Sequence, residues 1–384
     1  MNIKVMLLYM HGSHLISKLF TLLCSKVIGA RFYHDNPSTF PSIESPADEE
    51  GHGSHTSSIA AGVSTAGANL YGLAEGTARG GVPSARIAMY KVCWLEGCSD
   101  VDLLAGMDDA INDGVDLISI SIGGAASSYL DDPIAIGAFH AMMKGILTTC
   151  SAGNDGPYAS SVENTAPWIM TVGASTMDRQ FSTLVKFGNG VEMAGLPATH
   201  ICQKAGFTLL TSAGNAANGS LTLDKDPWTC DFGTLDEKKV RGKIVLCKEK
   251  ASAGYLKSVG VIGMIITLQE KVDKGFSFTL PAVYVDANAG DKIITYINST
   301  KYKFMFHLQL NIAAPGVDTL AGYSKLISIT ASPDDNRVNV YNVISGTSMA
   351  CPHVTSAAAY VKTFLLDWSP AAIKSCPNVN RLVP

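Results

Sequence analysis

The stretch between residues 85 and 175 alternates short apolar runs with helical patterns, and this alternation constrains the fold more than any other feature of the chain. Four apolar runs have the length and composition of buried strands: residues 85–92, 115–122, 145–150 and 168–174. Strands that are separated by single helices pair in parallel through crossover connections. We therefore predict an α/β fold with a parallel sheet flanked by helices.

Three helices are predicted around this sheet. The first begins after Ser99, for which Asp102 is a capping-box partner, and ends at Gly114. Five apolar residues at helical spacing form its expected buried stripe: Leu103, Leu104, Met107, Ala110 and Ile111. The second helix covers residues 133–144, and the third covers residues 348–366.

The pattern changes after the fourth strand. Between residues 181 and 306, strand-like and turn-like segments predominate. The clearest strand-like runs are residues 243–247, 261–266 and 281–285. We predict that this region is a separate β-rich domain inserted into the α/β domain, whose pattern resumes near Ile312.

Composition excludes two classes of partner. The chain has 384 residues, 47% of them hydrophobic, which is long enough for a large core and a smaller satellite domain. Its formal net charge is −4 without any block of like charges, whereas nucleic-acid binding requires a clustered basic face. No uninterrupted apolar run approaches the ~20 residues that span a bilayer. We expect neither a nucleic-acid partner nor membrane insertion.

The N-terminal residues 1–25 do not form a convincing signal peptide. Their two apolar pieces, residues 5–10 and 15–24, are interrupted by polar residues, and no small-residue cleavage site follows. We expect a degraded or incorrectly started N-terminus.

The nine cysteines allow two interpretations. Several can be buried thiols, which is a common state for cysteine. Alternatively, the local pairs Cys93–Cys98 and Cys230–Cys247 form disulfides in a secreted protein. We predict these two disulfides, and the sequons at Asn218 and Asn298 favour secretion as well.

Three short segments carry side chains with catalytic potential: GHGSHT at 51–56, SAGNDG at 151–156 and GTSMACPH at 346–353. Ser348 lies where a glycine-containing turn enters a helix, so the unpaired N–H groups of the first turn and the helix dipole favour an oxyanion nearby. Pro352 is expected in the first turn, which needs no N–H there. The alternative is that Ser348 or Thr347 only caps the helix.

The other two segments also allow simpler interpretations. His52 has glycine on both sides, which leaves its imidazole accessible, but it could also be a solvated turn residue or a helix cap. A zinc site would use His52 and His55, and no third ligand has suitable spacing. Asn154 follows a predicted strand, where its amide could donate to an oxyanion, although Asn-Asp-Gly is also a common turn sequence. We expect no metal or other cofactor.

Together, the three segments resemble the motifs of the subtilase family. GHGSHT resembles its histidine motif, SAGNDGP its oxyanion motif and GTSMACPHV its nucleophile motif. The stretches GLAEGTARGGVPSARIAMYKVCW and WSPAAIK are similar to the plant, cucumisin-like branch. The resemblance implies a subtilisin-like catalytic domain over residues 26–180 and 310–375 and a protease-associated domain over 181–309, and it leaves 1–25 and 376–384 unmatched.

The resemblance also implies a function. A secreted serine endopeptidase that acts on polypeptide substrates is expected, with His52 as the general base, Ser348 as the nucleophile and Asn154 as the oxyanion donor. Residues 121–123 are expected to pair with an extended substrate as an edge strand. The sequence does not indicate the cleavage preference or the oligomeric state.

The chain departs from the family pattern at three places. The family carries its catalytic Asp at the end of an apolar strand, in Asp-Thr/Ser-Gly, and neither Asp35 nor Asp48 fits, so we expect this motif and its strand to be absent. A Phe-Ser-Ser-Arg-Gly-Pro segment before Ile312 is missing, and WSPAAIKS turns abruptly into CPNVNRLVP. The alternative functions are a catalytically impaired or dead relative that binds peptides or proteins, and an unrelated α/β binding protein.

Overall fold

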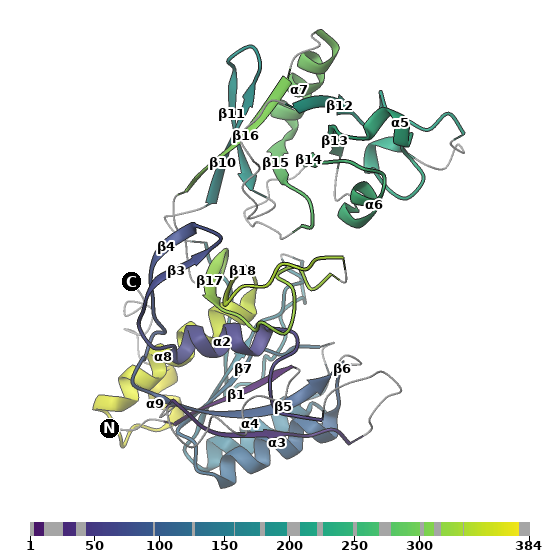
Figure 1. Ribbon diagram of the computed structural model, residues 1–384. Helices are drawn as coiled ribbons and strands as arrows, with labels where there is room; N and C mark the ends of the chain where they lie inside the picture. Colours follow the sequence, from purple (N-terminus) through teal and green to yellow (C-terminus); the bar gives the residue numbers. More distant parts are fainter. Residues whose placement is uncertain are drawn as a thin grey trace.

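The computed structural model describes residues 4–10, 26–35, 44–94, 97–124, 127–156, 158–176, 181–197, 208–220, 226–248, 252–268, 278–299, 303–310, 316–332 and 334–375. Within these residues the chain forms an α/β unit and a β-barrel unit, which lie one above the other in Figure 1. None of the helices described has the length and apolar character needed to cross a bilayer. The junction before Ile312 and the tail 376–384 lie outside the described residues.

A seven-stranded sheet, counted over the described residues, forms the centre of the α/β unit. Its parallel strands follow the order β2-β5-β1-β7-β8-β9. In that order their bounds are Val27–Phe32, Arg86–Trp94, Lys4–Met10, Leu117–Ile120, Leu147–Ser151 and Ile169–Val172. A short strand, β6 (Gly97–Cys98), pairs antiparallel with β5. The predicted parallel sheet is confirmed, and the four predicted strands correspond to β5, β7, β8 and β9.

The central strand β1 comes from residues that we expected to lie outside the catalytic domain. It is parallel to β5 on one side and to β7 on the other, with Leu8 opposite both Tyr90 and Ile120. The expectation that the strand before the histidine motif is absent is therefore wrong. Without a strand between them, β5 and β7 would each leave a row of backbone N–H and C=O groups unpaired. An apolar segment can pair with these groups even if it is distant in the sequence, and residues 4–10 do so.

Two pairs of helices cover opposite faces of the sheet (Figure 1). They are α2 and α8 on one face and α3 and α4 on the other: His52–Ala61, Thr347–Phe364, Asp100–Asn112 and Pro133–Met143. Adjacent residues of β7 divide between the two faces, because side chains alternate along a strand. Leu117 packs with α2 and α8, and Ile118 packs with α3 and α4. The short helix α9 (Pro370–Lys374) contacts α8.

The structure corrects two details of α3. Ser99 is its N-cap residue, but the Ser99 side chain makes no capping hydrogen bond. Asp102 is buried and accepts from the Asp35 backbone N–H at 3.0 Å, so the predicted capping box is wrong. Leu104 is 36% exposed, because it lies outside the arc of the helix that faces the sheet. The stripe residues that are buried are Leu103, Met107 and Ala110.

Two small antiparallel sheets lie beside α2. They pair β3 with β4 and β17 with β18. The bounds of these strands are Thr65–Leu70, Leu73–Ala78, Thr319–Gly322 and Tyr341–Ile344. Leu70, Ile329 and Val343 form a small buried cluster between the two sheets, which fixes them to each other.

The described part of residues 181–310 forms a closed barrel in the order β10-β11-β15-β14-β13-β12-β16. The bounds are Phe181–Phe187, Glu192–Pro197, Ala282–Asp286, Gly263–Leu268, Ile244–Lys248, Thr208–Ser212 and Lys303–Leu310. The first and last strands are antiparallel neighbours, with Phe181 opposite Leu310. The predicted β-rich character is confirmed, while the predicted domain boundaries stay a prediction.

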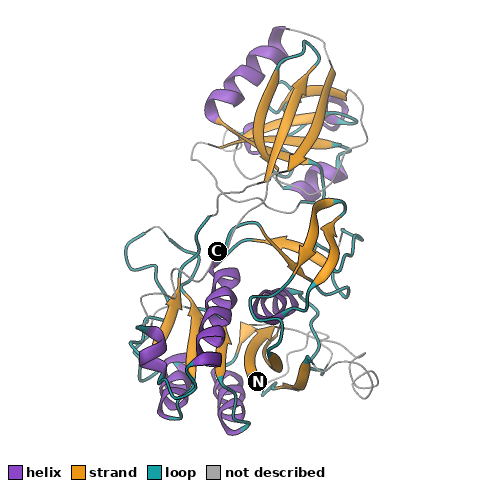
Figure 2. Ribbon diagram, turned by 90° about the vertical axis from the view of Figure 1, so that its left-hand side faces the viewer, coloured by secondary structure: helices purple, strands orange, loops and turns teal. Residues whose placement is uncertain are grey.

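The barrel unit has helices and a core of its own. Its helices are η1, α5, α6 and α7, with bounds Pro227–Thr229, Glu237–Val240, Ala253–Ser258 and Ala287–Ser299. Helix α7 packs along the barrel strands (Figure 2). Two buried clusters lie within the unit, one of them centred on Ile244, Leu246 and Ile265. The barrel unit therefore has the apolar interior that an independent domain requires.

Both predicted disulfides are confirmed. Cys93–Cys98 joins β5 to β6 with a Cα separation of 4.1 Å, and Cys230–Cys247 lies in the barrel unit with a Cα separation of 5.9 Å. Both separations are below the ~7 Å beyond which no bridge forms without backbone movement. Among the described cysteines, Cys150 and Cys351 are free and buried, so the buried-thiol interpretation holds for these two.

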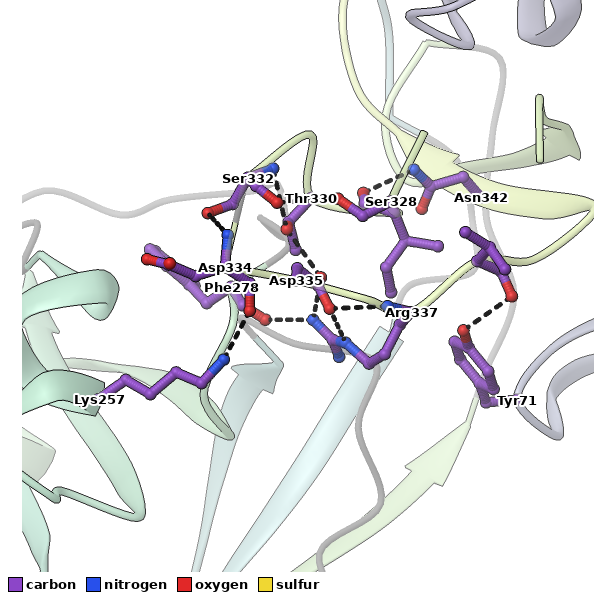
Figure 3. A network of polar contacts seen from close by, with 12 residues as sticks. Tyr71, Lys257, Phe278, Ser328, Thr330, Ser332, Asp334, Asp335, Arg337 and Asn342 are labelled. Atoms are coloured by element: carbon purple, nitrogen blue, oxygen red, sulfur yellow. Dashed lines mark hydrogen bonds and ion pairs between the residues drawn. The ribbon is translucent and has the colours of Figure 1, made fainter. Parts of the chain in front are cut away.

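The loop between β17 and β18 connects the α/β unit to the barrel through polar contacts (Figure 3). Arg337 pairs with the buried carboxylate of Asp335 and donates to the Phe278 carbonyl of the barrel unit at 2.9 Å. Lys257 of α6 donates to the Asp334 carbonyl at 2.8 Å. These contacts fix the loop at the point where it meets the barrel.

Candidate active site

The carboxyl ends of β7 and β8 meet the amino end of α8. Ser348 is the second residue of α8, Ser121 follows directly after β7, and Asn154 lies three residues beyond the end of β8. Hydrogen bonds connect these three places, as described below. The structure therefore brings Ser348 and Asn154 together at one edge of the parallel sheet.

Asn154 is attached to α8 through its amide oxygen. Asn154 Oδ1 accepts from the Thr347 backbone N–H at 3.0 Å and from Thr347 Oγ1 at 3.2 Å. Because the oxygen is the acceptor, the amide nitrogen is the free end of this exposed side chain. A free, exposed amide N–H₂ beside the first turn of a helix can donate to a negatively charged oxygen.

The alternative that Ser348 or Thr347 only caps the helix does not fit the structure. The N-cap residue is Gly346, which has no side chain to cap α8. The Thr347 hydroxyl is engaged by Asn154 and by the Gly153 carbonyl, 3.1 Å away. The Ser348 hydroxyl donates to the Ser121 carbonyl at 3.5 Å, which is a long hydrogen bond.

Pro352 lies in the sixth position of α8, so the expectation that it belongs to the first turn is wrong. Because proline has no N–H, it cannot donate to the carbonyl of Ser348, four residues earlier. That carbonyl accepts instead from Ser121 Oγ at 2.8 Å. Ser121 thus attaches the backbone of Ser348 to the end of β7.

His52 is the first residue of α2 and directly follows Gly51, a position that requires glycine. Gly51 is the N-cap residue with φ of 84°, in the left-handed region. A Cβ atom at Gly51 would overlap the ring of Tyr323. The His52 side chain is half-buried, so the glycines on both sides do not leave its imidazole fully accessible.

A carboxylate that the sequence analysis set aside holds the start of α2. Asp48 accepts from the backbone N–H groups of Glu50 at 3.2 Å, Gly51 at 2.7 Å and Ser54 at 2.6 Å. Burial raises the pKa of Asp48, and these N–H groups act in the opposite direction. An Asp just before the start of a helix is a helix N-terminal signal, and it could have been recognised in the sequence.

The Nδ1 atom of His52 is buried and has no hydrogen-bond partner among the described residues. In a Ser-His-Asp triad this nitrogen donates to the Asp, which fixes the tautomer and stabilises the imidazolium. Burial lowers the pKa of His52 to about 4, so the imidazole is neutral at neutral pH. Within the described part of the chain, the group that would stabilise the charged form is missing.

His52 is linked to Ser348 only indirectly. Over the described residues no hydrogen bond joins the two side chains, since the Ser348 hydroxyl contacts Ser121. Their helices, α2 and α8, pack against each other on one face of the sheet. The structure thus places His52 on the helix next to Ser348, while Asn154 is bonded directly to the helix of Ser348.

The end of β1 is where the family pattern requires an Asp. β1 ends at Met10, and His11 and Gly12 follow in the sequence. Asp35, the first acidic residue of the chain, donates its backbone N–H to Asp102 of α3, on the face opposite α2. Asp35 is therefore not placed to serve His52.

His55 connects α2 to the β17–β18 sheet. It is buried, with Nε2 at 3.1 Å from both the Thr319 and the Asn342 carbonyl oxygens. Burial lowers the pKa of His55 to about 3. Among the described residues, no group of three or more His, Cys, Asp and Glu side chains is arranged to hold a metal ion.

Comparisons with known proteins agree on one family. The model of the subtilase family matches residues 25–377. The chain is 48% identical to the subtilisin-like protease SBT4.15 of Arabidopsis thaliana, over 93% of this chain and 52% of that protein. It is 44% identical to SBT4.14 of the same plant, with the same two shares.

Among solved structures, the chain is similar to the psychrophilic subtilisin-like protease Apa1 from Pseudoalteromonas sp. AS-11. The TM-score is 0.45 at 16% identity, over 97% of this chain and 86% of that one.

The chain spans about half the length of the curated relatives it matches. The family model nevertheless covers nearly the whole chain, including the segments of His52, Asn154 and Ser348. From this match and the relatives that share it, we conclude that the chain belongs to the subtilase family, among its plant members.

Proposed function

We propose that this protein is a serine endopeptidase that cleaves peptide bonds through an acyl-enzyme on Ser348. The observation that carries the proposal is the pair of hydrogen bonds between Asn154 Oδ1 and Thr347, which leaves the Asn154 amide nitrogen free beside Ser348. A nucleophile needs such a preorganised donor next to it, because its attack on a carbonyl creates an oxyanion.

His52 acts as the general base in this proposal. It takes the proton of the Ser348 hydroxyl as the oxygen attacks the peptide carbonyl, and it returns a proton to the leaving amine. Water then attacks the acyl group. His52 takes a proton from the water and returns a proton to the Ser348 oxygen, which frees the serine. This step is expected to be slow, because no carboxylate among the described residues pairs with His52 Nδ1 to stabilise the imidazolium that forms.

The barrel unit is proposed to be a protease-associated domain that spans residues 181–309, between the two parts of the catalytic domain, 26–180 and 310–375. Its self-contained core and the neighbouring positions of its two ends support this division. Secretion is proposed as well, and the two disulfides support it because such bonds persist in oxidising compartments. Of the two sequon residues, Asn298 is exposed and suits glycosylation better than the half-buried Asn218.

Labelling with a fluorophosphonate probe tests the catalytic proposal. The probe should modify Ser348, and the modified peptide can be identified by mass spectrometry. The variant S348A should take up no label, and N154A should label more slowly because the charged adduct oxygen loses a donor. Binding of peptides without any labelling would favour the alternative, a catalytically dead relative that acts as a peptide-binding module.

A further inference from the structure

The residues around β17 connect the two sides of the proposed active site, because they contact both α2 and the turn that leads into α8. Helix α2 begins with His52, and the turn at Ser345 and Gly346 comes directly before α8. Within the described residues, the side chains of His52 and Ser348 share no hydrogen bond. The distance between them is therefore set by the backbone elements that carry them.

On the histidine side, two contacts attach β17 to α2. His55 Nε2 lies 3.1 Å from the Thr319 carbonyl oxygen at the start of the strand. Just beyond the end of the strand, the Tyr323 hydroxyl donates to the Glu50 carbonyl at 2.9 Å. Glu50 lies two residues before His52. The start of α2, and His52 with it, is therefore fixed relative to β17.

On the nucleophile side, Asp318 attaches the same segment to the turn before α8. The Asp318 backbone N–H donates to Ser345 Oγ at 2.8 Å, and the Ser345 hydroxyl donates to Asp318 Oδ1 at 3.1 Å. Two residues earlier, the Gly316 carbonyl accepts from the Gly346 backbone N–H at 2.8 Å. The turn that leads to Ser348 is thus bonded at two successive residues to the segment that begins β17.

The backbone at Asp318 is in an uncommon conformation. Its φ is 51°, in the left-handed region, where aspartate and asparagine are enriched among residues other than glycine. Such a conformation persists only where the surrounding structure constrains it. Asp318 is also buried, with 4% of its surface exposed. A buried carboxylate loses its hydration and needs hydrogen-bond donors, and the Ser345 hydroxyl is one of them.

Close packing seats the segment against α8. A Cβ atom at Gly316 would lie 2.6 Å from Ala174 Cβ and 3.2 Å from Ala350 Cβ, so this position has no room for a side chain. Ala350 is the fourth residue of α8. Residues 316–318 therefore contact the start of α8 directly, and they contact the start of α2 through β17.

We propose that Asp318 is a positioning residue which, through Ser345, sets where the Ser348 hydroxyl lies relative to His52. The transfer of the Ser348 proton requires the imidazole within hydrogen-bond reach in the reacting complex. A small misplacement of a reacting group can slow its reaction by roughly 10²-fold. Loss of the contact between Asp318 and Ser345 thus slows the attack by Ser348. This inference rests on the proposed function, because it concerns the same serine and histidine.

The test measures fluorophosphonate labelling at increasing probe concentration, which separates reversible probe binding from the rate constant of the attack by Ser348. D318G removes the carboxylate while glycine accepts the left-handed backbone without strain, and S345A removes the hydroxyl. Each should lower the rate constant about tenfold at unchanged probe affinity. D318N retains an acceptor and S345T retains a hydroxyl, so both should react near the rate of the unsubstituted chain.

Two controls make the test specific. The double variant D318G with S345A should react no more slowly than either single variant, because both changes remove one contact. The matched control S328A removes another buried serine hydroxyl, which donates to the Ser332 carbonyl in the β17–β18 loop. It should lower the free energy of unfolding and leave the rate constant unchanged. Urea unfolding shows which variants are folded, and if D318G is not, S345A and S345T test the same contact.

Three results would overturn the proposal: an unchanged rate constant in D318G and S345A, an equal loss in S328A, or a loss in D318N and S345T as large as in the variants they match. Labelling of the unsubstituted chain separates this inference from the proposed function. Label on Ser348 with equal rate constants in all variants defeats the role of Asp318 and leaves the endopeptidase proposal intact. No label on Ser348 of the unsubstituted chain defeats both, because Asp318 then has no reaction to support.

Discussion

The two sides of the proposed active site differ in how completely they are built. On the nucleophile side, Ser348, Thr347, Ser121 and Asn154 are joined by hydrogen bonds that lie between 2.8 and 3.5 Å. On the histidine side, the helix start is well fixed by Asp48, but the His52 Nδ1 atom is buried and unpaired within the described residues.

This difference shows that the two sides depend on different parts of the chain. The nucleophile side needs only residues that follow β7, follow β8 and begin α8, and all of these are present. The histidine side also needs a carboxylate from the end of β1, where the strand is present but the acid is not. The strands and helices of the site are therefore in place, whereas the carboxylate that would pair with His52 is missing from the end of β1.

Restoring the acid should produce the largest effect. The double change M10D and H11T creates Asp-Thr-Gly with the existing Gly12 at the end of β1. The new carboxylate should raise the pKa of His52 from about 4 and increase kcat on a peptide substrate. In subtilisin itself, a member of this family, the corresponding loss is on the order of 10⁴-fold, or about 5.5 kcal/mol.

The matched control is M10N with H11T, which has the same shape without the charge. If the Asp and Asn versions have equal kcat/KM, the unpaired imidazole is not what limits this chain. A shift of the pH–rate profile in the Asp version alone would tie the gain to His52.

Removing the oxyanion donor should be the next largest effect. N154A should slow the fluorophosphonate labelling of Ser348 by about 10²–10³-fold, a figure that comes from subtilisin itself. N154D retains an acceptor for Thr347 and lacks the amide donor, so it should be equally slow or slower. Labelling of N154D at the unsubstituted rate would show that the amide nitrogen has no role.

Acid should lower the free energy of unfolding through protonation of the buried histidine on α2, His55. The pKa of the buried His55 is lowered from its ordinary value of about 6.5 to about 3, so protonation favours the unfolded chain. The stability contributed by the neutral imidazole is complete above pH ~6.5 and is lost as the pH falls toward ~3. Each such imidazole changes the free energy of unfolding by up to about 1.4 kcal/mol per pH unit in this window.

The variant H55Q tests this sign. Its amide N–H₂ replaces the Nε2 donor to the Thr319 and Asn342 carbonyls, but it does not titrate. Urea unfolding at pH 7 and pH 5 should show a smaller acid-induced loss for H55Q than for the unsubstituted chain. An equal loss would assign the acid sensitivity to other groups.

The smallest effect is expected at Ser121. S121A removes the donor to the Ser348 carbonyl that Pro352 leaves without its helical partner. We expect a loss of about 1 kcal/mol in the free energy of unfolding and a several-fold slower labelling of Ser348. The double variant S121A with P352A supplies an N–H to that carbonyl from within the helix. If it is no more stable than S121A alone, the proposed exchange of partners is wrong.

Local patterns in the sequence predicted the parts of the fold that depend on local order. The alternation of apolar runs and helical stripes located β5, β7, β8 and β9 with α3 and α4, and the short cysteine spacings located both disulfides. The segments of Ser348, Asn154 and His52 were also recognisable, because each combines a polar residue with flanking glycines.

Features that depend on distant partners were missed. β1 is a strand only because β5 and β7, some 80 and 110 residues later, leave a place between them. The position of the Glu163 side chain depends on two glycines, Gly123 and Gly153, which follow the ends of different strands. Pro352 was misplaced because the start of α8 is fixed by Gly346, and the contact that accommodates the proline comes from Ser121.

The pairing of β10 with β16 has a consequence for how the α/β unit folds. A flexible excursion of this length between β9 and α8 would impose a loop-closure entropy that grows with the logarithm of its length. Because the first and last strands of the barrel are hydrogen-bonded neighbours, the folded barrel holds its own two ends side by side. For the loop-closure entropy of the α/β unit, the inserted domain of some 130 residues then counts as a short loop. Once the barrel has folded, helix α8, with Ser348 at its start, can therefore dock onto the sheet without a large loop-closure penalty from the inserted residues.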